Sequence, residues 1–398
     1  MPIRYLDDLP SSAELVVIGG GVVGAATAFY AARAGLRPLI VEARPRLCTL
    51  TTPVAAGAFR LQFDDLEELE LVRESAELFL NFEEFTGQAE YALPVKQQGY
   101  LWLTTDATTA ARQRETVDRL HGWGQADVEL LTGDETRERF AFVSPEVVQA
   151  RFRQGDGFLD TKRLTFGLAA GASADVVTSS EVTGFRVRGD KLAAVETTRG
   201  EITCGAAVLA TGPMSRGIAG LAGVELPLVT VRRQKLILPD IPEVPANAPM
   251  VIDEDTGAHW RPAYERGAWL LHTDPATPPS EPTMDVPTDH GFAFGLLDPA
   301  SASSVARVVP FWREVWDRGS DHWLLQAGQY TITPDYRPLI GPTHVEGLSV
   351  NTGYSGHGIM LGPAGGRICA DTLTSALGTV ANHFHPDREM ELAPQPTL

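Results

Sequence analysis

The sequence predicts an α/β fold with two joined domains, one discontinuous along the chain and the other an inserted antiparallel sheet. Near the N-terminus an apolar run, a glycine-rich turn and an alanine-rich segment follow one another, which is typical of a strand, a turn and a helix. From about Leu226 to Ala300, prolines are frequent and short runs alternate as strands do. The length of 398 residues suits two domains better than one small core.

The expected elements follow in chain order. A buried strand over 14–18, a helix over 22–34 closed by Gly35 and a strand over 39–41 make one βαβ unit. Further helices are expected over 65–85, 107–123, 160–172 and 364–377, and further strands over 101–103, 175–177, 192–197, 206–209, 231–238 and 268–272. Residues 1–90, 145–225 and 325–398 are therefore expected to form a nucleotide-binding domain, and residues 91–144 and 226–324 a substrate domain.

A dinucleotide-binding motif lies in the first βαβ unit. Gly19 permits the tight turn, Gly21 lets the backbone approach a pyrophosphate, and Gly24 allows close packing of helix and strand. The N-terminus of the helix that begins near Val22 supplies N–H donors for the phosphates. Glu42 ends the next strand, 18 residues after Gly24, where its carboxylate can accept hydrogen bonds from both ribose hydroxyls. The motif predicts a Rossmann-type domain but does not separate FAD from NAD.

Two further motifs occur with the first, in a fixed order. They are Ala-Val-Leu-Ala-Thr-Gly over 207–212 and Gly-Tyr-Ser-Gly-His-Gly over 353–358, the latter preceded by the segments 329–335 and 337–342. This combination resembles the D-amino-acid oxidase superfamily of FAD-dependent oxidoreductases, especially its sarcosine oxidase, glycine oxidase and dimethylglycine dehydrogenase branches. The resemblance implies an FAD-binding domain, an antiparallel-sheet substrate domain and oxidation of a C–N bond in a small amine or amino acid. Hydride would pass to flavin N5, and water would hydrolyse the imine product.

The motifs and the resemblance together predict which residues contact FAD. Donors around His357 would face the pyrimidine edge of the flavin and stabilise negative charge there. For each position taken singly, a packing role remains open. The predicted contacts are Gly19, Gly21, Val22, Val23, Gly24, Glu42, Ala43, Arg44, Thr51, Thr52, Ala55, Ala56, Gly57, Val182, Ala210, Thr211, Gly212, Gly356, His357, Gly358, Ile359 and Met360.

The sequence departs from the family at the positions of covalent flavin attachment. The loop that holds a histidine in some members has Pro53 and Val54 here, and the late cysteine position matches Gly328. Cys48 lies nearby and is interpreted as a bystander thiol. Non-covalent FAD is therefore expected.

The familiar carboxylate-binding residues are also missing. Phe63 and Met360 stand at the positions of an arginine and a lysine, and Tyr330 stands at an arginine of the glycine oxidase branch. Either the substrate lacks a carboxylate near the reacting carbon, or Arg60, Arg261, Arg337 or another group binds it. Leu270 matches a lysine that assists oxygen near flavin N5 in the family, and its loss should slow reaction with oxygen. A dehydrogenase that passes electrons to another carrier is therefore an alternative to an oxidase. Arg60, Tyr264, His272, Tyr330 and His357 are predicted as the catalytic groups, although His272 equally suits a place in the sheet.

Net charge bears on which partners are expected. A value of -18 disfavours nucleic acids and anionic membranes, and the family resemblance implies a small-molecule amine as the partner. Cys48, Cys204 and Cys369 match no metal-ligand spacing, so no metal is expected. A polar N-terminus and the lack of a long apolar stretch predict a cytoplasmic protein. Oligomeric state stays open.

Three alternative functions are weighed against amine oxidation. They are a flavin-binding electron-transfer subunit of a larger complex, an FAD-dependent hydroxylase and an NAD-dependent dehydrogenase. The Gly-Asp motif typical of the hydroxylases is not evident in the sequence.

Overall fold

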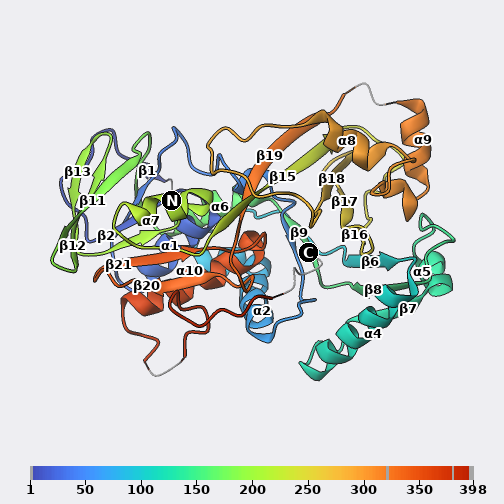
Figure 1. Cartoon of the computed structure of the whole chain (residues 1–398), viewed down its shortest axis with the longest axis horizontal. Helices are drawn as coiled ribbons and strands as arrows, with labels where there is room; N and C mark the ends of the chain where they lie inside the picture. The colour runs from blue at the N-terminus through green and yellow to red at the C-terminus, as the bar shows by residue number, and fades with distance from the viewer. Residues whose placement is uncertain (1–2, 320–321, 379–380, 394–398) are drawn as a thin grey trace.

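Two large sheets organise the computed structural model, which describes residues 3–319, 322–378 and 381–393. In Figure 1 the seven-stranded sheet lies on the left and the eight-stranded sheet on the right. The seven-stranded sheet is parallel except for its last strand, which pairs antiparallel with β21. Its order is β1 (Arg4–Tyr5), β10 (Asp175–Val177), β3 (Pro38–Val41), β2 (Leu15–Ile18), β14 (Ala207–Leu209), β21 (Leu348–Thr352) and β20 (Leu339–Pro342).

Both faces of the parallel sheet are covered, which explains its unbroken apolar strands. Leu15 and Val17 of β2 pack toward one core, whereas Val16 and Ile18 pack toward another. The first core is closed by α1 (Val22–Arg33), α2 (Leu66–Leu80), α6 (Thr161–Gly171) and α10 (Gly358–Leu373). The second is closed by α7 (Ser215–Gly220) and by the small sheet of β11 (Val182–Arg188), β12 (Lys191–Thr197) and β13 (Gly200–Thr203).

The eight-stranded sheet is mainly antiparallel. Its order is β19 (Leu324–Ile332), β15 (Val229–Leu238), β18 (Ala268–His272), β17 (Ala258–Pro262), β16 (Met250–Asp253), β6 (Tyr100–Thr104), β8 (Gln149–Arg153) and β7 (Glu129–Thr132). A separate apolar core lies between this sheet and α8 (His290–Leu297), η3 (Val305–Arg307) and α9 (Phe311–Arg318). The edge is flanked by α4 (Ala107–Gly122) and α5 (Gly133–Arg139), as Figure 1 shows.

Short elements connect the two sheets. A three-stranded sheet contains β4 (Ala58–Phe59), β9 (Gly157–Leu159) and β5 (Val95–Lys96). The remaining helices are α3 (Phe82–Thr86) and the single turns η1 (Thr52–Val54) and η2 (Gly212–Met214). The predicted α/β class, with a parallel nucleotide-type sheet and an added antiparallel sheet, is confirmed.

Two helix predictions are corrected. The helix expected over 65–85 is broken at Asn81, which has φ -121° and ψ 37° and ends α2. The helix expected over 364–377 begins earlier, at Gly358, and ends at Leu373. The first turns of this helix are rich in glycine, and Gly366 lets α10 approach α1, because a Cβ there would lie 2.7 Å from the backbone carbon of Ala26.

Two strands lie outside the sheet that the expected domain boundaries suggest. β8 pairs with β6 and β7, and β19 pairs with β15 over nine residues. Both belong to the eight-stranded sheet, although 145–225 and 325–398 were assigned to the nucleotide-binding domain. Their sequences alone do not identify a pairing partner. The domain boundaries themselves stay a prediction.

Candidate active site

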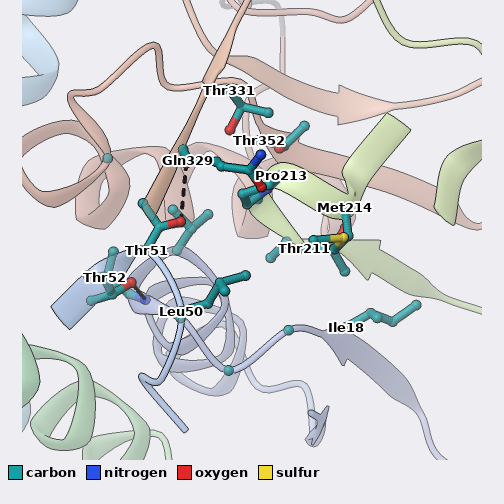
Figure 2. Close-up of a pocket in the computed structure, with 18 of the residues that line it drawn as sticks. Ile18, Leu50, Thr51, Thr52, Thr211, Pro213, Met214, Gln329, Thr331 and Thr352 are labelled. Carbon is teal, nitrogen blue, oxygen red and sulfur yellow. Dashed lines mark hydrogen bonds between the residues drawn. The ribbon is translucent and has the colours of Figure 1, made fainter. Parts of the chain in front are cut away.

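A cavity, called here the larger cavity, follows the carboxyl ends of the parallel strands, where open α/β sheets bind ligands. Its volume is about 320 Å³. Most of the predicted FAD contacts line it: Gly19, Gly21, Val22, Val23, Glu42, Ala43, Arg44, Thr51, Thr52, Ala55, Val182, Ala210, Thr211, Gly212, Gly356, Gly358 and Ile359. Figure 2 shows part of this wall, including Ile18 at the end of β2 and Thr51 beside Gln329.

The glycine motif brings β2, α1 and β14 together. Gly19 has φ 109°, and a Cβ there would lie 2.4 Å from the carbonyl oxygen of Ala210. A Cβ on Gly24 would lie 1.9 Å from the carbonyl oxygen of Gly19. Gly24 therefore serves packing and does not line the cavity. Gly21 is the N-cap residue of α1 and has no side chain to cap the helix. The Thr52 hydroxyl accepts from the Val22 N–H at 3.2 Å, and the N–H groups that follow can donate to an anion at this helix N-terminus.

Glu42 lines the larger cavity beside the glycine turn. Its carboxylate accepts hydrogen bonds from the backbone N–H groups of Gly20 at 2.7 Å and Arg44 at 2.8 Å. Burial raises the pKa of Glu42, and these two hydrogen bonds oppose that effect. The carboxylate is thus oriented at the end of β3, where it can also accept from a ribose.

The turn between β21 and α10 forms the far end of the larger cavity. Gly356 has φ 100°, and a Cβ there would lie 2.5 Å from Cε2 of Tyr330, so only glycine fits. His357 is the N-cap residue of α10, whose first turn has no side-chain cap. Gly358 and Ile359, the first two residues of this helix, line the cavity. This helix N-terminus can stabilise negative charge on a bound group.

The loop over 51–57 lies between the two ends and is held from outside. The Thr51 hydroxyl donates to the carbonyl oxygen of Gln329 at 3.1 Å, as Figure 2 shows. Lys235 Nζ donates to the carbonyl oxygen of Pro53 at 2.9 Å, and Arg261 Nε to that of Ala56 at 2.7 Å. These contacts explain why the loop keeps its backbone against the cavity without a regular strand.

A smaller cavity of about 70 Å³ adjoins the turn at His357. It shares Ala55, Tyr330, Ser355, Gly356 and Ile359 with the larger cavity. Its wall also contains the predicted residues Ala56, Gly57, Arg60, His357 and Met360. The polar residues that sequence reasoning missed are Tyr100, Arg233, His259, Thr273 and Tyr336.

Two predicted catalytic residues do not line this smaller cavity. Side chains alternate along β18, so Leu271 and Thr273 face it while His272 Nε2 lies 2.9 Å from the carbonyl oxygen of Thr256. Tyr264 instead packs against Arg261 and Trp269, with ring centroids of Tyr264 and Trp269 6.5 Å apart. Arg60, Tyr330 and His357 are the predicted catalytic residues that the structure brings together.

The arginines named as carboxylate-binding alternatives are also separated by the structure. Arg261 donates to the carbonyl oxygens of Ala56 and Pro262 at 2.7 Å each. Arg337 forms ion pairs with Asp65 and Glu67. Of the three, only Arg60 lines the smaller cavity. Sequence reasoning missed Arg233 because the sequence of β15 has the alternation of an ordinary strand. Only the structure shows which face of β15 borders the cavity.

The fold and the two joined cavities define a dinucleotide-binding oxidoreductase. The extended larger cavity fits FAD, because a ribose acceptor, a helix N-terminus and a glycine turn follow one another along it. Comparison with known proteins agrees: the chain belongs to the DAO family of FAD-dependent oxidoreductases, whose model matches residues 14–372. The cofactor is FAD.

Individual relatives support the same assignment. The chain is 26% identical over 389 residues to mitochondrial dimethylglycine dehydrogenase of Mus musculus, covering 90% of this chain and 42% of that protein. It is 25% identical over 380 residues to sarcosine oxidase subunit beta of Arthrobacter sp, covering 92% and 87%. The solved L-proline dehydrogenase from P. horikoshii matches with a TM-score of 0.80 and 26% identity, covering 92% and 95%. The chain spans less than half the length of the dimethylglycine dehydrogenase.

Neither a metal-ligand cluster nor a membrane-spanning helix is found among the described residues. Within 3–319, 322–378 and 381–393, no group of three or more His, Cys, Asp or Glu side chains is arranged to hold a metal ion. Over the same ranges, every helix is too short or too polar to cross a membrane.

Proposed function

We propose that the chain is an FAD-dependent enzyme that oxidises a C–N bond in a small amine or amino acid. The observation that carries the proposal is the continuity of the two cavities at the turn around Gly356. A cofactor extending from Glu42 to this turn would end beside the smaller cavity, which offers room for a small substrate. Relatives named as dimethylglycine dehydrogenase and sarcosine oxidase subunit beta act on such compounds.

FAD, when bound, supplies a hydride acceptor for the carbon next to the substrate nitrogen. The chain positions and shields that reaction. The N–H groups at the start of α10 favour negative charge at the adjacent end of the cofactor. Burial raises the pKa of Tyr330, so its hydroxyl stays a neutral donor. Burial lowers the pKa of His259 to about 4, so its ring is neutral near pH 7. Water then hydrolyses the imine product.

The cavity wall supports non-covalent attachment. Cys48 lines the larger cavity, but burial raises the pKa of its thiol to about 11, which leaves little thiolate at neutral pH. Gly328 has no side chain, and a Cβ there would lie 3.3 Å from Cα of Thr51. Acid precipitation should therefore release all of the flavin into the supernatant. Flavin that stays in the protein pellet would contradict this part of the proposal.

The central experiment is anaerobic mixing of the purified holoenzyme with N-methyl amino acids, D-amino acids, cyclic imino acids and simple amines. We expect at least one compound to bleach the flavin absorbance. Subsequent exposure to air shows whether the acceptor is oxygen or another electron carrier. An oxidase regains its colour at once, whereas a dehydrogenase needs an added carrier. Failure of every compound to bleach the flavin would overturn catalysis and favour an electron-transfer subunit. NADPH consumption during turnover would favour a hydroxylase.

A further inference from the structure

Two arginines and no acidic residue of the described ranges line the smaller cavity. Among the described residues on its wall, Arg60 and Arg233 supply the positive charge, the ring of His259 is neutral near pH 7 because burial lowers its pKa to about 4, and none is an Asp or Glu. This cavity lies in a chain with a net charge of -18. The local excess of basic groups therefore opposes the charge of the whole molecule, and it favours an anionic ligand.

Arg233 is the basic residue whose surroundings are most informative. It lies on β15 with a relative exposure of 8%. Its Nη1 donates to the carbonyl oxygen of Arg232 at 3.3 Å, while its buried Nε has no hydrogen-bond partner among the described residues. Its Cζ lies 5.6 Å from the ring centroid of Tyr330. Burial lowers the pKa of Arg233. This direction is expected for a buried cation that has no anion close enough to offset the loss of water.

The other buried arginines of the eight-stranded sheet show what Arg233 lacks. Arg151, with 4% relative exposure, lies 3.3 Å from a carboxylate oxygen of Glu254. Arg261 is held by two backbone carbonyls. Asp274 is close enough to Arg233 to oppose the lowering of its pKa. Over the described ranges, however, the two side chains form no ion pair within 4 Å. The Asp274 carboxylate accepts instead from the Ala276 N–H at 2.8 Å. An isolated guanidinium that faces a cavity needs an anion from a ligand.

A second donor stands on the same cavity wall. Tyr336 lines the cavity and has φ 60°, a left-handed conformation that is unfavourable for a bulky residue. The surrounding loop is held by the ion pair of Arg388 with Asp335 at 2.8 Å, and by a 2.8 Å hydrogen bond from the Thr333 hydroxyl to the carbonyl oxygen of Arg337. Strain that persists at a cavity is a sign of a functional constraint.

We propose that Arg233 binds the carboxylate of the substrate and that the Tyr336 hydroxyl donates to the same group. The inference rests on the proposed function and narrows its substrate class to amino acids with a free carboxylate. Relatives have arginine or lysine at the positions of Phe63, Met360 and Tyr330. In this chain Arg233 of β15 would bind the carboxylate in their place. Simple amines that lack a carboxylate would then be poor substrates.

The test compares Arg233→Met, Arg233→Lys and Tyr336→Phe with Arg232→Met in the holoenzyme. Arg232 is the matched control, because it is the neighbouring arginine and donates to the carbonyl oxygen of Pro287 at 3.2 Å, away from the cavity. Acetate, propionate and benzoate are titrated against the flavin absorbance, which reports binding without turnover. Circular dichroism and flavin content show whether each variant is folded.

We expect Arg233→Met to weaken carboxylate binding about 100-fold, Arg233→Lys and Tyr336→Phe to weaken it about 10-fold, and Arg232→Met to change it less than about twofold. The efficiency ratio between an amino acid and its decarboxylated amine should fall about 100-fold in Arg233→Met. Equal carboxylate affinity in Arg233→Met and wild type would overturn the inference and leave the proposed function standing. If no compound bleaches the wild-type flavin, the proposed function fails, and the carboxylate titration still decides the role of Arg233.

Discussion

Glu68, in the first turn of α2, is a carboxylic acid with only 7% relative exposure. Burial raises its pKa to about 8, and the neighbouring Asp65 adds to the effect. The unfolded chain ionises near 4.5, so between these two values the folded state holds more protons than the unfolded state. The contribution of Glu68 to stability is therefore complete below about pH 4.5 and is lost as the pH rises to about 8.

Glu68→Gln should remove this pH dependence. The variant is expected to match wild type near pH 4.5 and to exceed its free energy of unfolding by about 2 to 4 kcal/mol at pH 8. Urea unfolding at several pH values measures the difference. Glu77→Gln is the control on the same helix, because Glu77 is exposed. A constant difference between Glu68→Gln and wild type at all pH values would contradict the assignment.

Glu42 gives a second prediction at the scale of one residue. Its two carboxylate oxygens accept from Gly20 and Arg44, so Glu42→Gln places an NH₂ group against one of these N–H donors. We expect the affinity for FAD to fall about 10- to 100-fold, since a mismatched buried donor is costly. Quenching of flavin fluorescence on titration into the apoprotein measures the affinity. Glu14→Gln, which alters a surface ion pair with Arg37, should bind FAD as wild type does.

At the scale of elements, the contact of α1 with α10 depends on a glycine. Alanine is usually better than glycine inside a helix by about 1 kcal/mol. Gly366→Ala should nevertheless destabilise the protein, because a Cβ there would lie 2.7 Å from the backbone carbon of Ala26. Gly122→Ala in α4 meets nothing within 4 Å and should be neutral or stabilising. Thermal unfolding should show a lower midpoint for Gly366→Ala and an unchanged or higher midpoint for Gly122→Ala, and a stabilised Gly366→Ala would contradict the close packing.

The same contact shows how far elements follow from the sequence. Continuous apolar runs and glycine spacing were enough to predict β2, α1, β3 and the place of Glu42, because these patterns are local. The start of α10 was missed because its glycines serve a contact with a distant helix. Likewise, Arg233 could not be placed in the site, since strand alternation shows two faces of β15 but not which one borders a cavity. For the same reason the sequence left two places open for His272, and the structure has it in the sheet with Nε2 2.9 Å from the carbonyl oxygen of Thr256.

At the scale of the whole molecule, the larger cavity joins both sheets. Its wall combines Glu42 beside β3 and Thr211 beside β14 with Gln329 of β19 in the eight-stranded sheet. A ligand that binds this wall should stabilise both halves together, even though the glycine motif belongs to only one of them.

Urea unfolding with and without FAD tests this coupling. Trp102, Trp260 and Trp312 are buried within the eight-stranded sheet and its helices, so tryptophan fluorescence largely reports the half without the glycine motif. FAD at about 100 times its dissociation constant should raise the free energy of unfolding by about 2.7 kcal/mol. We expect FAD to shift the tryptophan transition to higher urea, where it coincides with the flavin transition of the same sample. If FAD leaves the tryptophan transition where it is without FAD, the eight-stranded sheet unfolds independently, and a cofactor that bridges the two sheets is excluded.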